Sequence, residues 1–226
     1  MRSLPLPLAL TARLTPVAVL ACAGWAMASG PDKTTSTGSG DTSAQQAAGQ
    51  SGGDTASSSS GSTAATKTYS ASPAPCGSIP VATVKSLVPG AKTAGKEIPS
   101  TDTKLRRTCS WNALKGYDYR WLDVSFEIMD TDAAAAKEYK DRVAEKSGGG
   151  AVPGLGDSGY SVVNLTTEDK QQTREGVVLA QVSNALVVVT YNGSDFESKK
   201  APSTDVINKG AIQAAKSAVN ALKGSQ

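Results

Sequence analysis

Histidine is absent from the chain of 226 residues, and cysteine occurs only three times. Without an imidazole, Ser-His-Asp catalysis, Cys-His catalysis and zinc sites that use histidine are all excluded. The two cysteines beyond the N-terminal leader are too few for a zinc site made of thiolates. Any enzyme built on this sequence would have to use carboxylates, lysine or tyrosine alone. We therefore predict no catalytic residue, no metal site and no cofactor.

Large apolar side chains are missing from residues 29–72, which contain no Leu, Ile, Val, Met, Phe or Trp and a single Tyr69. Such a segment, rich in Ser, Thr, Gly and Ala, cannot bury enough apolar surface to offset the entropy lost on ordering. We predict a disordered linker over residues 29–72 and one globular domain over residues 73–226. As a flexible coil of about 44 residues, the linker would span roughly 35 Å on average, which suits a tether.

Long basic and long apolar runs are also lacking. No basic run is interleaved with aromatic residues, and the net charge is only +3, so the sequence does not predict nucleic-acid binding. After the leader, no segment approaches the roughly 20 apolar residues needed to span a bilayer.

The N-terminus carries a short apolar run that ends at Cys22 and follows a leader containing Arg2 and Arg13. This pattern predicts an export signal over residues 1–28. The segment Val19-Leu20-Ala21-Cys22 resembles a bacterial lipobox, in which the cysteine becomes the first mature residue and carries lipid, although Leu20 is larger than the residue usually found there. Each buried methylene contributes about 0.8 kcal/mol, and two lipid chains suffice for stable anchoring.

Ordinary cleavage after Ala28 is the alternative, since Ala26-Met27-Ala28 is a good small-x-small site. The long linker favours the lipobox, because a freely secreted domain does not need a tether. We expect a protein held on the extracellular face of the cell membrane by lipid on Cys22, with a secreted protein as the alternative.

Cys76 and Cys109 form an even pair in a chain directed to an oxidising compartment, which predicts a disulfide. Closing a loop of about 33 residues stabilises a fold by roughly 3–4 kcal/mol on the chain-entropy model. A redox-active pair usually has a C-x-x-C spacing, which these two residues do not have.

The spacing of apolar residues predicts the elements of the domain. We expect helices from Ser78, over 132–146 and over 203–222, and strands near 107–111, 119–129, 160–164, 173–183 and 185–192. The order α-β-β-α-β-β-β-α indicates an α+β fold, an antiparallel sheet of about five strands with helices packed against it. The strand near 119–129 alternates, with Leu122 to Ile128 on a buried face and Asp123 to Glu127 on a face exposed to water.

Three motifs carry a family resemblance: the start Cys76-Gly-Ser-Ile79, the later Cys109-Ser-Trp111 and the loop Val152-Pro-Gly-Leu-Gly-Asp157. Over residues 74–224 they resemble an actinobacterial lipoprotein family known as domain of unknown function 3558. The resemblance implies a lipobox or signal, a Ser/Thr/Gly linker and pairing of the two cysteines. It also implies a fold similar to the Mog1/PsbP-like domains, which act mostly as binding or assembly modules, and no established activity.

Four residues are candidates for a ligand surface: Trp121, Tyr117, Tyr119 and Asp157. The three aromatic residues cluster around the first predicted hairpin, and Trp121 falls on the polar face of its strand, where an exposed aromatic patch indicates binding. Asp157 follows a tight glycine loop, where it can bind backbone donors in a structural role or bind a ligand.

We therefore expect an exported, non-catalytic binding or assembly module of the cell envelope. Its partners would be the membrane, through Cys22, and an unidentified envelope protein or small ligand. The alternatives are an interaction partner of other envelope proteins and a carboxylate-dependent hydrolase of cell-wall glycan. Asp123 and Glu127 lie about 13 Å apart along a strand, farther than the roughly 5–9.5 Å of a glycosidase pair, which argues against the hydrolase.

Overall fold

The structure is a computed structural model that describes residues 67–226. The export signal, Cys22 and the linker up to residue 66 lie outside the described residues, so the predictions made for them stay predictions.

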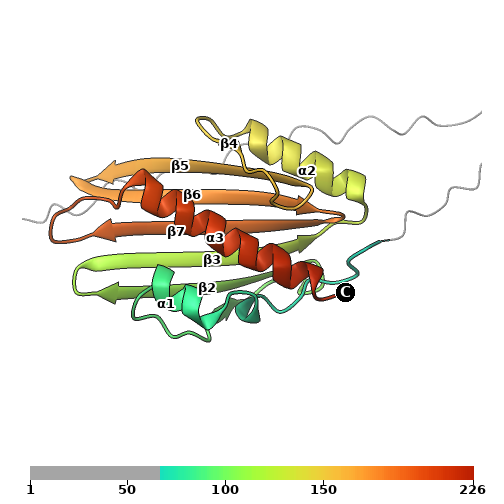
Figure 1. Cartoon of the computed structure of the whole chain (residues 1–226), viewed down its shortest axis with the longest axis horizontal. Helices are drawn as coiled ribbons and strands as arrows, with labels where there is room; N and C mark the ends of the chain where they lie inside the picture. The colour runs from blue at the N-terminus through green and yellow to red at the C-terminus, as the bar shows by residue number, and fades with distance from the viewer. Residues whose placement is uncertain (1–66) are drawn as a thin grey trace, which may run out of the picture. The chain divides into compact units, whose positions relative to one another are not determined.

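Three α-helices, a short 3-10 helix and seven strands make up the described chain (Figure 1). In chain order they are η1 (Pro75–Gly77), α1 (Val81–Leu87), β1 (Lys96–Ile98), β2 (Arg106–Lys115), β3 (Asp118–Ile128), α2 (Asp132–Ala144), β4 (Gly150–Ala151), β5 (Ser158–Glu168), β6 (Gln171–Val182), β7 (Ala185–Asp195) and α3 (Thr204–Lys223).

The strands form one sheet in the order β1-β2-β3-β7-β6-β5-β4, and every neighbouring pair is antiparallel. The predicted α+β class with one antiparallel sheet is confirmed. The predicted count of about five strands and the predicted element order are wrong. Both errors come from β1 and β4, which have three and two residues and are too short to show an alternating pattern.

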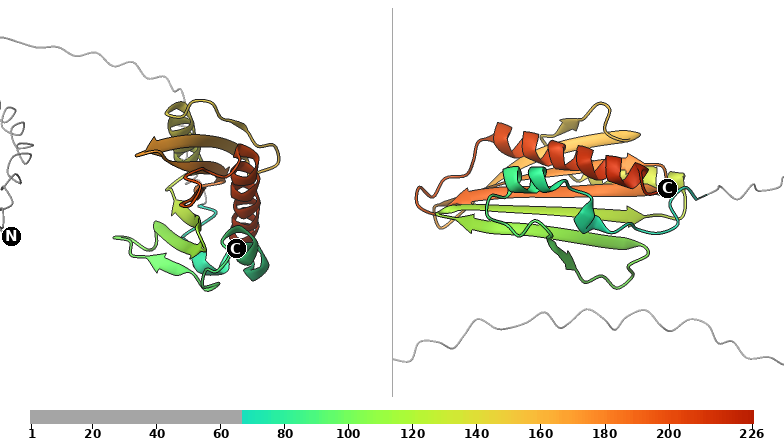
Figure 2. Two further views of the ribbon diagram at one scale, coloured as in Figure 1. Left: turned by 90° about the vertical axis from the view of Figure 1, so that its left-hand side faces the viewer. Right: turned by 60° about the horizontal axis from the view of Figure 1, so that its bottom comes forward.

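One face of the sheet is covered by α1 and α3 and holds the core (Figure 2). The side chains of Leu122, Val124, Phe126 and Ile128 on β3 are buried there, as their alternation predicts. The helix α3 meets the sheet through small residues, including Gly210 and four buried alanines. A Cβ at Gly210 would collide with the ring of Tyr191, so a glycine is required for this close approach.

The opposite face, which the sequence predicts to be wet, is covered at one end by α2. Glu127 is only 7% exposed, and its carboxylate pairs with Arg142 of α2 at 2.6 Å and with Arg106 at 3.5 Å. Ser125, Leu179 and Leu186 are buried on the same side. The prediction that Glu127 faces water is therefore wrong, because α2 folds back over this end of the strands.

The helix boundaries are set by polar caps in two of three cases. The Thr131 hydroxyl accepts a hydrogen bond from the Ala134 amide, and Ser203 accepts one from Val206, so both helices begin where a cap is expected. Ser78 does not cap α1: Pro80 is the N-cap, and the Ser78 hydroxyl donates to the carbonyl of Pro75 instead.

The disulfide Cys76–Cys109 is confirmed, with a Cα–Cα distance of 5.1 Å. It joins η1 to β2 and so attaches the N-terminal part of the domain to the sheet. Tyr69, at the end of the segment predicted as linker, is buried, and its backbone exchanges hydrogen bonds with the Asn184 side chain. The packed domain therefore includes chain upstream of residue 73.

Candidate binding surface

Beyond the end covered by α2, the second face of the sheet carries two rows of side chains across β2, β3 and β7. Residues opposite one another in register share a face. One row is Ser110, Asp123 and Thr190, and the next is Asn112, Trp121 and Asn192. We call these six residues the open sheet surface. The second row continues through Glu175 on β6 to Asn164 on β5, so hydroxyl, amide and carboxylate groups surround a single indole.

Trp121 is fixed at the centre of this surface by its own indole. Its Nε1–H donates to the Ser110 hydroxyl at 2.8 Å and to the Asp123 carboxylate at 2.7 Å. The side chain still leaves 37% of its area exposed. A large ring that is held by two acceptors and open to solvent has little rotamer freedom left to lose on binding.

Aromatic side chains gather at one end of the open sheet surface. Tyr119 packs edge-to-face on Trp121 with ring centroids 6.5 Å apart, and its other neighbour is Phe196 at 6.0 Å. Partial burial raises the pKa of Tyr119, and the charge of Asp123 adds to this shift. Tyr117, in the turn between β2 and β3, is 57% exposed, and its carbonyl accepts a hydrogen bond from the Phe196 amide at 2.9 Å.

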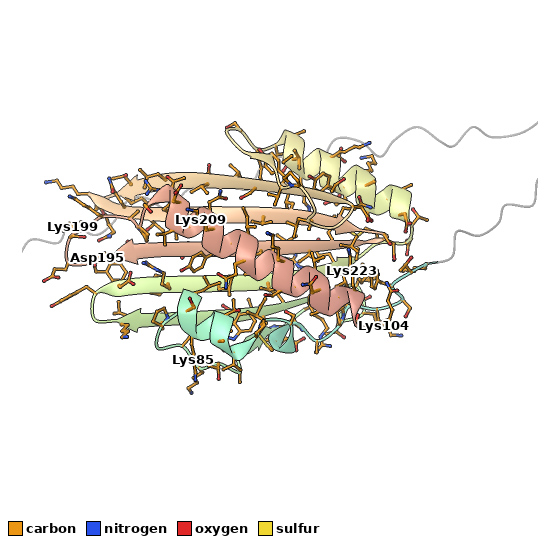
Figure 3. The ribbon with its side chains drawn as sticks, in the orientation of Figure 1. Lys85, Lys104, Asp195, Lys199, Lys209 and Lys223 are labelled. Carbon is orange, nitrogen blue, oxygen red and sulfur yellow. A yellow bond between two sulfur atoms is a disulfide. The ribbon has the colours of Figure 1, made fainter. Side chains whose placement is uncertain are left out.

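Phe196 also belongs to this aromatic group, which its sequence position does not predict. It lies in the loop after β7, next to Asp195, which Figure 3 labels at this end of the domain. The Asp195 carboxylate accepts hydrogen bonds from the Ser198 amide and hydroxyl at 2.6 and 2.7 Å, which lower the pKa of Asp195. This Asp-x-x-Ser turn is the one sequence signal that a structured loop follows β7.

Asp157 lies at the opposite end of the sheet and does not join the aromatic residues. Its carboxylate accepts a hydrogen bond from the Ser183 amide at 2.6 Å, and its own amide donates to Gln181 at 2.8 Å. Ser183 is in the turn between β6 and β7 and has a φ of 48°. The structure thus gives Asp157 a structural contact, namely support of a strained hairpin turn.

A cavity of about 280 Å³ lies between Tyr139 of α2 and the glycine loop that precedes β5. Gly154 and Gly156 have φ values of 72° and 66°, and a Cβ at Gly156 would collide with the carbonyl of Gln181. These two glycines are explained by the turn itself. The cavity is lined mainly by the backbone of the loop and by few side chains that could orient a ligand.

Two further properties concern the described residues 67–226 only. No group of three or more His, Cys, Asp or Glu side chains there is arranged to hold a metal ion. No helix of this part of the chain is both long and apolar enough to cross a membrane.

Comparison with known proteins adds little to this geometry. No protein-family model and no curated protein matches the chain. A crystal structure of a protein from Bacteroides thetaiotaomicron VPI-5482 is similar at 9% sequence identity and a TM-score of 0.30, over 49% of this chain and 50% of that chain. A likeness this weak, over about half of each chain, bears on neither fold nor function.

Proposed function

We propose that this domain is a non-catalytic binding module that recognises a partner in the cell envelope with its open sheet surface. The observation that carries the proposal is the position of Trp121, fixed by Ser110 and Asp123 yet 37% exposed at the centre of the surface. Tryptophan is among the residues that most often dominate the energy of an interface.

The surroundings of Trp121 define the kind of partner that fits. Asn112 and Asn192 flank it in register, and amide side chains both donate and accept hydrogen bonds. The ring itself supplies an apolar contact. A partner with a small apolar face and many polar groups would contact both the ring and the flanking amides. Such a partner is either a small ligand or the surface of an envelope protein.

Rigid support is the second reason that this surface suits binding. All six residues lie on the three strands β2, β3 and β7, which pair along most of their length. Binding by a preformed surface avoids the entropy cost of ordering a loop.

The location in the envelope is part of the same proposal. Lipid on Cys22 would anchor the chain on the extracellular face of the membrane, and the linker would extend the domain away from it. The Cys76–Cys109 disulfide is consistent with an oxidising compartment. Growth with a labelled fatty acid tests the anchor: label should enter the wild type and not Cys22→Ser, and an unlabelled mature chain beginning at Ser29 would refute it.

Binding is tested with the full chain carrying Cys22→Ser, so that lipid cannot contribute. We expect saturable binding to envelopes isolated from the producing cells, and a loss of about tenfold or more in affinity with Trp121→Ala. Val206→Ala, at an exposed apolar position on α3, is the matched control and should bind like the parent. Equal binding by Trp121→Ala and its parent would contradict the choice of surface.

A further inference from the structure

The outer edge of β5 is paired along only part of its length. The strand β4 pairs with Tyr160 and Ser161, and no other strand of the described chain lies beyond β5 (Figure 1). The segment Val162–Glu168 therefore presents one side of its backbone without a strand partner. An unpaired edge of this length is a template for another strand.

The direction of the free backbone groups follows from one hydrogen bond. The Val152 amide donates to the Gly159 carbonyl at 2.8 Å, so the backbone groups of Gly159 point toward the outer edge. In an antiparallel ladder, both groups of one residue point to the same side, and alternate residues point the same way. The amide and carbonyl groups of Val163, Leu165 and Thr167 thus face outward, which leaves six groups able to pair.

The features that normally protect an edge are absent from this segment. Between Val162 and Glu168 there is no proline, no glycine and no lysine, and the only charge is Glu168 at the end. Leu165 is 48% exposed. At the opposite edge of the sheet, charged residues are present: β1 is three residues long, begins Lys96-Glu97 and pairs with Thr108–Ser110 of β2, and β2 ends at Lys115.

We propose that the free edge of β5 pairs with the same edge of a second copy of this chain. An antiparallel pair with its twofold axis at Leu165 places Leu165 opposite Leu165 and Val163 opposite Thr167. These are the three outward-facing residues, so all six groups of each copy find a partner. Between them, Asn164 faces Thr166.

Charge and side-chain type support a second copy as the occupant. In this register Glu168 lies opposite Val162, so the two glutamates are at opposite ends of the pair and do not repel each other. The two exposed leucines meet at the axis, where an apolar cross-strand pair is favourable. The segment is therefore complementary to itself in a single register.

Pairing in this way would also orient the open sheet surfaces. The twofold axis of an antiparallel edge pair is perpendicular to the sheet, so both copies turn the same face to the same side. Two open sheet surfaces would then point in one direction, and a partner with repeated binding groups would gain from simultaneous contact. The pairing itself does not depend on the proposed function.

Sedimentation equilibrium of the full chain with Cys22→Ser tests the pairing, since lipid then cannot cause association. We expect a monomer–dimer equilibrium for this parent and at least about a tenfold weaker association with Leu165→Lys, because two ammonium groups would meet at the axis. Leu114→Lys, at an exposed leucine on β2 near the other edge, should dimerise like the parent. A monomer at every concentration, or an unchanged dimer with Leu165→Lys, would overturn the proposal.

Oxidative cross-linking tests the register and does not depend on how Leu165→Lys folds. Residues opposite each other in a hydrogen-bonded pair have Cα atoms about 5.5 Å apart, within the range of a disulfide. Leu165→Cys should therefore yield a covalent dimer under oxidation. Two copies of Thr167→Cys would lie about 13 Å apart along the strands and should not cross-link. Equal cross-linking of both variants would exclude this register.

Discussion

The second face of the sheet has two halves that share the same strands and differ in what covers them. On one half, α2 packs over β6 and β7, so that Glu127 and Leu186 are buried. On the other half, Trp121 and Asn112 of the open sheet surface are exposed, and Asp123, Thr190 and Asn192 are half-buried. Along β3, the change from covered to open occurs between Ser125 and Asp123.

This contrast teaches that the alternation of polar and apolar residues along a strand predicts the face on which a residue lies. It does not predict whether a helix covers that face. Asp123 and Glu127 look equivalent in sequence, since both are acidic and lie on the same side of β3. One accepts a hydrogen bond from an exposed indole, and the other pairs with an arginine beneath a helix. Four predictions test this difference, from the largest expected effect to the smallest.

Leu186→Ala removes a fully buried side chain from the covered half. We expect it to lower the free energy of unfolding by about 2–5 kcal/mol, because the cavity cannot close fully under α2. Denaturant unfolding of the variant and the parent gives this value. A loss below about 1 kcal/mol would mean that the covered half is not packed as described.

Arg142→Ala removes the main partner of the Glu127 carboxylate and leaves Arg106 at 3.5 Å. We expect a loss of about 1–3 kcal/mol in the free energy of unfolding, since a buried carboxylate is left poorly paired. The double variant Glu127→Gln with Arg142→Met is the control and should regain part of the loss. If Arg142→Ala leaves the free energy of unfolding unchanged, Glu127 is exposed and the covered half does not extend to it.

Trp121→Phe keeps an aromatic ring on the open half and removes the N–H that binds Ser110 and Asp123. The expected loss is about 1 kcal/mol in the free energy of unfolding, because the hydrogen bonds and the part of the indole that are removed lie at a site that water can reach. The same unfolding assay measures it. A loss as large as that of Leu186→Ala would show that the open half carries as much of the core as the covered half.

The smallest effect concerns the pH dependence of Tyr119. Partial burial, followed by the Asp123 charge, raises its pKa in the folded protein, so folding favours the protonated phenol. Its contribution to stability is complete below the unfolded pKa of about 10 and is lost as the pH rises through the folded pKa. When the free energy of unfolding is measured from neutral to alkaline pH, it should therefore fall less steeply at alkaline pH in Tyr119→Phe than in the parent.

Asp123→Asn provides the check on the cause of this shift. It removes the charge that opposes ionisation of Tyr119 and so lowers the folded pKa of Tyr119. The alkaline loss of stability should therefore end at a lower pH and be smaller than in the parent. An unchanged alkaline profile in both variants would mean that Tyr119 is solvated like a free tyrosine.

Much of the fold follows from local patterns in the sequence. The alternation from Leu122 to Ile128 predicted which side chains of β3 lie on the core face, and the run Leu186–Val189, apolar on both sides, is typical of a central strand, which β7 is. The caps Thr131 and Ser203 set the starts of α2 and α3. These features depend on neighbours within a few residues, and such neighbours are visible in sequence.

The site could be predicted only in part, because it depends on strand order and register. Trp121 and Tyr119 were found from their place on β3, whereas Asn112 and Asn192 join them only through pairing with β2 and β7. Phe196 reaches Tyr119 through a loop without periodicity. Asp157, chosen for its glycine loop, turned out to contact a hairpin turn at the other end of the sheet.

The central claim, that the open half of this face is the binding surface, is tested most directly by the indole N–H signals in a nitrogen–proton NMR spectrum. Trp121 Nε1–H lies on the open sheet surface, and Trp111 Nε1–H, which donates to the Thr93 carbonyl at 3.1 Å, lies on the α1/α3 side and serves as an internal control. On addition of solubilised envelope material to the Cys22→Ser chain, we predict a saturable shift of the Trp121 signal and an unchanged Trp111 signal. Saturable binding that leaves the Trp121 signal in place would contradict it.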